Sequence, residues 1–171
     1  MDGNAILVAE GVRKVYRSGA EDVVALHDLD LEVPRGQFVA VMGPSGSGKT
    51  PLLNCLSSLD EIDRGRVVVD GKSIHELSGG EQQRVAVARA LAGTPSVVWA
   101  DEPTGNLDSE MAHAVMELLA ELHAEGLSIV LVTHDRTVAS YADRLLTVRD
   151  GRLVGDEPLG TALEPELVAA V

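Results

Sequence analysis

The sequence has few aromatic residues and only one cysteine. Aromatic residues make up 2% of the 171 residues, and Cys55 has no second cysteine with which to form an internal disulfide. A single thiol is also too few for a zinc cage. We therefore expect a reducing compartment, and we expect Cys55, which lies among leucines, to be a small core residue without chemistry of its own.

Basic residues are also few. The chain has 14 Lys and Arg against 27 Asp and Glu, which gives a formal net charge of −13. A protein that binds a polyanion needs a basic face, so a nucleic-acid partner and an anionic membrane surface are both disfavoured. No apolar run approaches the roughly 18 residues of a membrane-spanning helix, and Met1 to Asn4 lacks the basic start of a secretory signal. The sequence predicts a cytoplasmic protein without direct membrane insertion.

Short β-rich segments alternate with helical ones along the chain, which is typical of an α/β fold in one domain. Strands are expected at residues 23–33, 37–42, 67–69, 97–100 and 129–132. A first helix should follow residues 43–50, with Leu52, Leu53, Leu56 and Leu59 on one side. The clearest helix spans 109–125, and its predicted buried stripe consists of Met111, Val115, Leu118 and Leu122.

A glycine-rich motif separates the second expected strand from the first expected helix. Residues 43–50 match the pattern G-x-x-x-x-G-K-[ST] in the strand–loop–helix context that this pattern requires. Glycines let backbone N–H groups converge on phosphate oxygens, and the helix N-terminus adds its dipole. The predicted nucleotide-binding residues of the loop are Gly43, Pro44, Ser45, Gly46, Ser47, Gly48, Lys49 and Thr50.

Two residues of this loop have predicted roles of their own. Lys49 should reach the β- and γ-phosphates, and the Thr50 hydroxyl should ligate Mg²⁺. Pro51 falls in the first helical turn, where it removes no intrahelical hydrogen bond, but it disfavours the helical conformation for Thr50. The alternative, a glycine-rich turn that binds nothing, does not explain why motif and context agree.

Polar residues also follow two of the expected apolar strands. Neighbouring residues point to opposite sides of a strand, so Asp101 is the candidate Mg²⁺ ligand and Glu102 the candidate base for the attacking water. His134 follows the strand at 129–132 and is predicted to donate a hydrogen bond to the γ-phosphate. Each of these residues alone could be a solvated strand end; the nearby phosphate motif favours catalysis. Tyr16 is a candidate to stack on a base, although core packing explains it equally well.

Taken together, these residues resemble the nucleotide-binding subunit of an ATP-binding cassette (ABC) transporter. Residues 77–84, Leu-Ser-Gly-Gly-Glu-Gln-Gln-Arg, match the signature of that family. The resemblance implies a P-loop NTPase fold of the ABC ATPase type, with a RecA-like core and an N-terminal β-rich part. It also implies ATP and Mg²⁺ as cofactors. In the family the signature caps ATP held by the other subunit of a head-to-tail dimer, and the residues implied here are Ser78, Gly79, Gly80 and Gln82.

The resemblance covers roughly residues 5–155 and extends to two further sites. His134 matches the switch histidine, and Asp108 lies in a stretch that resembles the loop crossing the dimer interface. Residues 100–109 are similar to one subgroup, which serves lipoprotein release, macrolide or antimicrobial-peptide export, and a cell-division complex. The resemblance thus implies a homodimer joined through ATP that drives transport through a transmembrane permease partner. This partner would hold it on the inner face of the plasma membrane.

The interval between the phosphate motif and the signature is short. Twenty-seven residues separate Thr50 from Ser78, whereas in the family this interval is several times longer. There it carries a core strand, the Mg²⁺-ligating glutamine of the Q-loop and a helical subdomain that docks on the membrane partner, none of which has a counterpart in this sequence. We expect a shortened nucleotide-binding domain at residues 1–155 and a C-terminal tail at 156–171. Such a chain should bind Mg·ATP weakly, hydrolyse it poorly and fail to couple to a transporter.

Two other functions stay open at this point. One is a truncated remnant that is non-functional or binds nucleotide only. The other is an SMC-like, DNA-associated ATPase, which shares a similar signature; its long coiled coils have no counterpart here, and the acidic composition argues against DNA. A GTPase is disfavoured because the sequence has no Asn-Lys-x-Asp or Thr-Lys-x-Asp motif.

Overall fold

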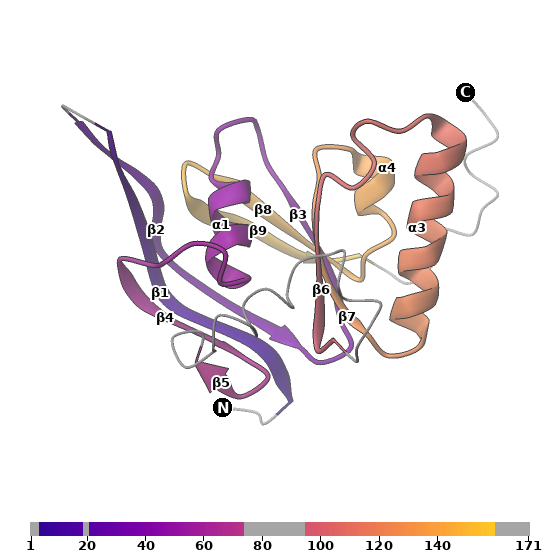
Figure 1. Cartoon of the computed structure of the whole chain (residues 1–171), viewed down its shortest axis with the longest axis horizontal. Coiled ribbons are helices and arrows are strands. Elements are labelled where there is room, and N and C mark those ends of the chain that lie inside the picture. The colour runs from indigo at the N-terminus through magenta and orange to yellow at the C-terminus, as the bar shows by residue number, and fades with distance from the viewer. Residues whose placement is uncertain (1–3, 19–20, 74–94, 160–171) are drawn as a thin grey trace.

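Two β-sheets form the framework of the molecule. The computed structural model describes residues 4–18, 21–73 and 95–159 (Figure 1). The first sheet is antiparallel and has the strand order β2-β1-β4-β5. Its strands are β1 (Ala5–Ser18), β2 (Glu21–Pro34), β4 (Arg64–Val69) and β5 (Lys72–Ser73).

The second sheet has the strand order β6-β7-β3-β8-β9, in which the first four strands are parallel and β9 runs antiparallel to β8. Its strands are β3 (Phe38–Met42), β6 (Val97–Asp101), β7 (Ser128–Val132), β8 (Arg144–Arg149) and β9 (Arg152–Pro158). The helices are α1 (Lys49–Leu56), α3 (Ser109–Ala124) and α4 (Arg136–Ala139). The expected α/β fold class is confirmed.

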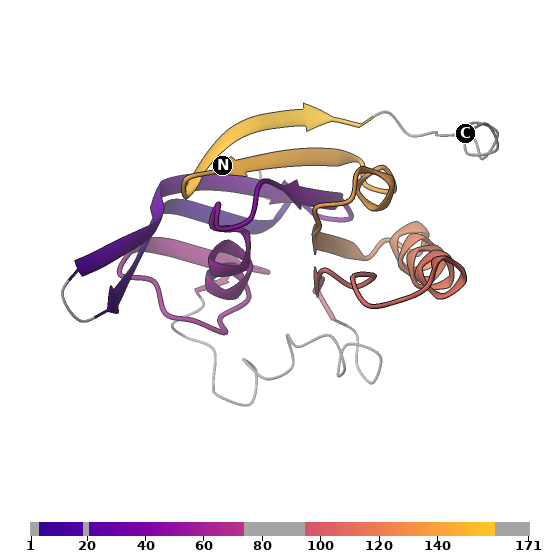
Figure 2. The same ribbon diagram turned by 90° about the horizontal axis from the view of Figure 1, so that it is seen from above.

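Strands β3, β6 and β7 of the second sheet are almost entirely apolar because both of their faces are covered. Val39 and Val41 of β3 pack into a core shared with α1 and the first sheet, whereas Phe38 and Ala40 pack into a second core with α3 and α4. Figures 1 and 2 show α1 between the two sheets and α3 on the other side of the second sheet. A polar side chain on a strand that is buried on both faces would lose its contact with water, so such strands consist of near-continuous apolar runs.

Every expected strand overlaps an observed one, although β3 begins after Gln37 and strands β1, β5, β8 and β9 were not predicted. The prediction for two helical faces was partly wrong. In α3 the residues Met111 and Leu118 are exposed, and Met116 and Leu119 are buried instead. The apolar residues of α3 cover more than one stripe, and packing against β6 and β7 selects which of them is buried. Leu59 is also exposed, because α1 ends at Leu56.

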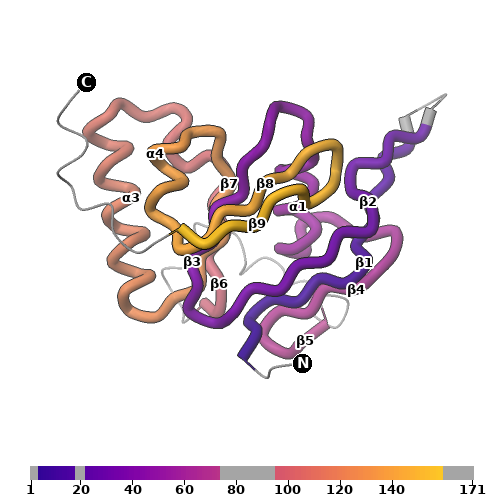
Figure 3. The backbone as a smooth tube through the Cα atoms, turned by 180° about the vertical axis from the view of Figure 1, so that it is seen from behind, coloured from indigo at the N-terminus to yellow at the C-terminus, as the bar shows by residue number. Residues whose placement is uncertain are grey.

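The topology brings several loops to one edge of the second sheet. Since β3, β6 and β7 are parallel, the loops that follow their carboxyl ends lie at the same edge. The turn between β8 and β9 lies at this same edge, because β8 is also parallel to β3. It joins β2, since the N–H of His27 donates to the carbonyl of Gly151 at 2.9 Å (Figure 3). In the part of the chain that the structure describes, no helix is long and apolar enough to cross a membrane.

Candidate nucleotide-binding site

The glycine-rich loop at residues 43–50 connects β3 to α1, as predicted. Gly48 caps α1 with φ of +103°, a left-handed conformation that favours glycine. A Cβ on Gly48 would lie 2.7 Å from the carbonyl oxygen of Ala25, and one on Gly43 would clash with the carbonyl oxygen of Val148. The N–H of Gly151 donates to the carbonyl of Ser47 at 2.8 Å. Backbone contacts with little free space therefore determine the shape of the loop.

The side chains of the loop leave polar groups available for a phosphate ligand. Lys49 Nζ donates to the carbonyl oxygens of Gly43 and Pro44 at 2.8 and 2.9 Å, so its ammonium lies back over the loop. The Ser47 hydroxyl is buried, and no hydrogen-bond partner for it lies among the described residues. A cradle of backbone N–H groups with a lysine above it is suited to a phosphate chain.

Thr50 and Asp101 come together from α1 and β6. The Thr50 hydroxyl donates to Asp101 Oδ2 at 3.4 Å, although the two residues lie 51 positions apart in the sequence. Pro51 does not pull Thr50 out of the helix, because both residues are part of α1. A hydroxyl and a carboxylate oxygen are ligand types that Mg²⁺ accepts while it keeps several waters. This pair fits the predicted metal ligands.

Glu102 and His134 are joined by hydrogen bonds at the ends of β6 and β7. His134 Nδ1 lies 2.9 and 3.0 Å from the two carboxylate oxygens of Glu102. Glu102 has φ of +45°, a conformation that costs a non-glycine residue about 1–3 kcal/mol. Its N–H donates to the carbonyl of Val132 at 2.9 Å, which holds it in this conformation. The arrangement presents one carboxylate, oriented by a histidine, next to the glycine-rich loop.

Tyr16 lies on β1 and is not a core residue. It is 38% exposed, and its hydroxyl donates to Asp60 Oδ2 at 2.8 Å. The alternative of core packing is therefore wrong, and the residue is partly open to solvent. Cys55 is buried, as expected, and burial, with the nearby carboxylate of Asp60, raises the pKa of its thiol to about 11. Such a thiol stays protonated at neutral pH and is unreactive.

The remaining predicted residues lie elsewhere. Asp108 caps α3 by accepting from the N–H of Met111 at 2.9 Å, so it has a local structural role; its predicted role at a dimer interface stays a prediction. The predicted signature residues Ser78, Gly79, Gly80 and Gln82 lie outside the described residues.

Lys14 and Asp60 were missed by sequence reasoning. They form an ion pair of 2.7 Å across 46 positions, and no local pattern in the sequence could have indicated it.

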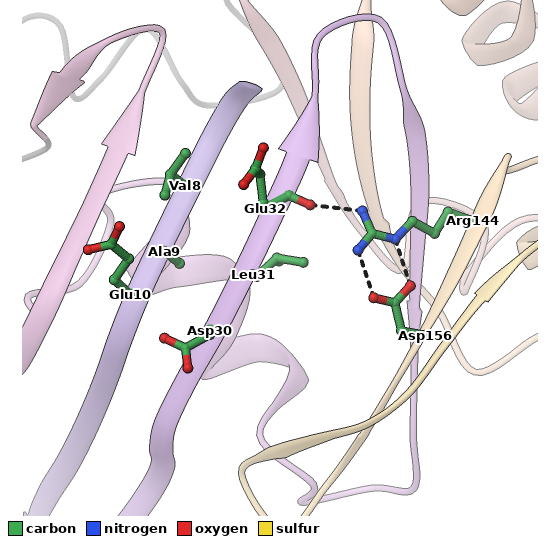
Figure 4. A pocket seen from close by; sticks show the side chains of 8 residues that line it. All are labelled: Val8, Ala9, Glu10, Asp30, Leu31, Glu32, Arg144 and Asp156. Carbon is green, nitrogen blue, oxygen red and sulfur yellow. Dashed lines mark hydrogen bonds and ion pairs between the residues drawn. The ribbon is translucent and has the colours of Figure 1, made fainter. Parts of the chain in front are cut away.

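A separate groove of about 350 Å³ lies between β1, β2, β8 and β9 (Figure 4). Its single lining cation, Arg144, donates to both oxygens of Asp156 at 2.7 Å and to the carbonyl of Glu32 at 2.8 Å. These bonds lower the pKa of Asp156 and raise that of Arg144. They use the guanidinium to join the two sheets, so the groove is a structural contact and not part of the candidate site.

Comparisons with known proteins identify relatives over most of the chain. A family model described as ABC transporter matches residues 26–76 and 71–105. The macrolide export ATP-binding/permease protein MacB of Chlorobium luteolum is 36% identical over 215 residues, which covers 85% of this chain and 32% of that protein. The uncharacterized ABC transporter ATP-binding protein MJ1508 of Methanocaldococcus jannaschii is 32% identical, with 87% of this chain and 98% of the relative covered. The chain spans about a third of the length of the MacB relatives that it matches.

Solved structures agree with these relatives. The dimeric ATP-binding cassette MJ0796, in a post-hydrolysis state bound to ADP and Pi, is 28% identical with a TM-score of 0.80, covering 91% of this chain and all of that one. A second dimeric structure of MJ0796 has a TM-score of 0.79 at 29% identity. The two-sheet fold with a glycine-rich loop after β3 is therefore similar to that of known ATP-binding cassettes.

Proposed function

We propose that this chain, which belongs to the ATP-binding proteins of ABC transporters, binds Mg·ATP at residues 43–50 and serves an export permease. The family follows from 32% identity to MJ1508 across 98% of that protein. Its members are ABC-type ATPases, and ATP hydrolysis is a property of the family. The cassette MJ0796 binds ADP and Pi, which supports a nucleotide ligand for the same fold.

One observation carries the proposal: side chains with complementary chemistry come together where α1 begins and β6 ends, namely Lys49, Thr50, Asp101 and Glu102. Thr50 and Asp101 would hold Mg²⁺, which supplies positive charge against the phosphates. Lys49 would exchange its two carbonyl acceptors for phosphate oxygens, and the loop N–H groups would donate to the same chain.

Glu102 would accept the proton of the attacking water, since its carboxylate lies at the end of β6 beside the metal-ligand candidate Asp101. His134 donates to this carboxylate at 2.9 Å and so orients it. Tyr16 would stack on the base with its accessible face. The roles of Glu102 and Tyr16 are those that the sequence predicts, whereas His134 was predicted to donate to the γ-phosphate and here donates to Glu102.

The partners are part of the same proposal. The relatives named macrolide export ATP-binding/permease protein MacB combine, by name, an ATP-binding and a permease function, which supports a transmembrane permease as the partner of this chain. The dimeric structures of MJ0796 support a homodimer. In it, Ser78, Gly79, Gly80, Gln82 and Asp108 would complete the ATP site of the other copy. The chain, with its nucleotide-binding domain at residues 1–155, would then lie on the inner face of the membrane.

We also propose that hydrolysis and coupling are impaired in this chain. Three observations support a missing internal segment: the 27 residues between Thr50 and Ser78, the match of the family model in two separate pieces, and an alignment of 215 residues that covers 85% of this chain of 171. The relative thus has residues that this chain lacks. A remnant that binds nucleotide without hydrolysing it is the second candidate, favoured by the same three observations.

The deciding experiment is a thermal melt of the full chain with and without Mg·ATP. A ligand that binds only the folded state, at a hundredfold excess over its Kd, adds about 2.7 kcal/mol of stability. We expect ATP to raise the melting temperature of the native chain and of Lys72→Ala, which removes the same charge elsewhere, but not of Lys49→Ala. Equal shifts in all three proteins, or none, would contradict the proposed phosphate site.

Phosphate release then separates an ATPase from a nucleotide-binding remnant. We expect a slow rate in the native chain, well below that of full-length MJ1508, and a further loss of about 10²-fold or more in Glu102→Gln. A rate equal to that of MJ1508 would contradict the proposed impairment. If Glu102→Gln leaves the native rate unchanged, the chain is a remnant that binds nucleotide without hydrolysing it, and the phosphate measured does not come from hydrolysis at this site.

A further inference from the structure

A polar cluster outside the phosphate loop joins β1 to the segment that follows α1. Lys14 Nζ donates to Asp60 Oδ1 at 2.7 Å and to the carbonyl of Glu61 at 2.6 Å. The Tyr16 hydroxyl donates to the second oxygen of Asp60 at 2.8 Å. One carboxylate thus receives a hydrogen bond from each of two side chains of the same strand.

Backbone hydrogen bonds strengthen this connection on both sides. The N–H of Val15 donates to Asp63 Oδ2 at 2.7 Å, and the N–H of Asp63 donates to the carbonyl of Arg13 at 2.9 Å. The N–H of Asp60 in turn donates to the carbonyl of Asn54 in α1 at 3.1 Å. The cluster is therefore anchored to the helix that begins at the phosphate loop.

The cluster also determines how the Tyr16 ring is placed. Lys14 Nζ lies 5.1 Å from the centre of the ring, over one of its faces, and Lys14 itself is buried. The ring nevertheless stays partly exposed. Burial and the hydrogen bond to Asp60 raise the pKa of the Tyr16 hydroxyl to about 12, so it remains protonated and keeps donating at neutral pH. One face is covered by a cation and the hydroxyl is held, which leaves the other face for a ligand.

The cluster lies beyond the end of α1 that is far from the phosphate loop. The eight residues of α1 rise about 12 Å between the phosphate loop and the segment that contains Asp60. A ring whose hydroxyl is held in place loses little conformational freedom when a base stacks on it.

We propose that Asp60 is a positioning residue for adenine recognition, because it holds the Tyr16 ring, with Lys14 behind it, so that one face stacks on the base. The inference rests on the proposed nucleotide site at residues 43–50. Asp60 itself touches neither base nor phosphate. Its effect therefore falls on ligands that carry a base and spares ligands that consist of phosphate alone.

The test compares calorimetric affinities of the full chain for Mg·ATP and for inorganic triphosphate with Mg²⁺. Removing a stacked aromatic ring with Tyr16→Ala should weaken ATP binding about tenfold. Asp60→Ala should weaken it about fivefold, and Tyr16→Phe, which keeps the ring and loses only the tether, about threefold. Triphosphate affinity should stay within about a factor of two throughout.

Tyr141→Phe is the matched control. It removes the same hydroxyl from a tyrosine bonded to His113 Nδ1 at 3.1 Å, next to α3 and on the other side of the second sheet. It should change neither affinity. Tyr16 is partly exposed, and Tyr16→Phe keeps the ion pair of Lys14 and Asp60, so this variant should fold. Its ATP affinity therefore tests the tether between Tyr16 and Asp60 even if Asp60→Ala fails to fold.

Four results would overturn the inference, and each is distinct. Equal weakening of ATP and triphosphate in Asp60→Ala and Tyr16→Phe would mean a purely structural role for the cluster. A loss in Tyr16→Ala alone would mean that the ring stacks without needing Asp60. Failure of the native chain to bind either ligand would contradict the proposed function itself, and the inference with it; binding of triphosphate alone would leave the phosphate site intact and exclude base recognition by Tyr16.

Discussion

The two ends of the candidate nucleotide site are held in different ways. At the phosphate end, main-chain atoms are in close contact: Gly48 lies against the carbonyl of Ala25, and Gly151 donates to the carbonyl of Ser47. At the base end, side chains hold the site in place: Asp60 accepts hydrogen bonds from Lys14 and Tyr16.

This difference matches what each end must recognise. Every nucleotide presents the same phosphate chain, which backbone N–H groups can bind without any particular side chain. Bases differ, and a side-chain cluster can be altered one substitution at a time. The phosphate end should therefore be intolerant of added atoms where its main-chain groups touch, and insensitive to pH, whereas the base end should tolerate substitution and respond to protonation.

The largest effect on stability is expected from Gly48→Ala, measured in the absence of nucleotide. Gly48 has φ of +103°, and an added Cβ would lie 2.7 Å from the carbonyl oxygen of Ala25. The variant should therefore lose about 2–4 kcal/mol of unfolding free energy. Gly46→Ala is the matched control: Gly46 has φ of +76°, but a Cβ there meets nothing within 4 Å. It should lose only the conformational cost of about 1–2 kcal/mol in urea unfolding. Equal losses would mean that close approach does not determine the loop.

A medium effect is expected from Asp60→Asn, and it should depend on pH. Burial raises the pKa of Asp60, but the hydrogen bonds from Lys14 and Tyr16 outweigh it and hold the pKa below its ordinary value. A lowered folded-state pKa stabilises the protein above the unfolded-state pKa of about 4 and loses this contribution as the pH falls below it.

Asp60→Asn should therefore cost about 1 kcal/mol at pH 7 and much less at pH 3.5, measured by urea unfolding at both values. Gly46→Ala, which changes no titratable group, should cost the same at both pH values. If the cost of Asp60→Asn does not decrease in acid, the ion pair with Lys14 does not stabilise the base end.

The smallest effect is expected from Pro51→Ser. The N–H of Leu52 makes the first helical hydrogen bond of α1, to the carbonyl of Gly48 at 2.9 Å, so Pro51 stands where no N–H is needed. The substitution should change the unfolding free energy by less than about 0.5 kcal/mol and leave Mg·ATP affinity unchanged in calorimetry. A clear gain in affinity would mean that Pro51 restrains Thr50 after all.

The predicted and observed structures agree where the signal is local. Strands β3, β6 and β7 were predictable because residues such as Val39 and Val41 lie in short apolar runs, and burial on both faces requires such runs. Strands β8 and β9, which carry charged residues, were not predicted. The stripe of α3 was predicted wrongly: Met111 and Leu118 satisfy helical spacing as well as Met116 and Leu119 do. Only contact with β6 and β7 distinguishes the two faces.

Local sequence preferences are sufficient to specify the phosphate loop, the strand before it and the helix after it. The loop needs glycine at positive φ between a buried strand and the start of a helix. These requirements concern residues that are neighbours in the sequence, and residues 43–50 satisfy them. Only the tertiary structure decided which side chains meet: Thr50 with Asp101, Glu102 with His134, and Tyr16 with Asp60. These partners lie 51, 32 and 44 positions apart, and strand order and helix packing bring them together, which no local preference of the chain encodes.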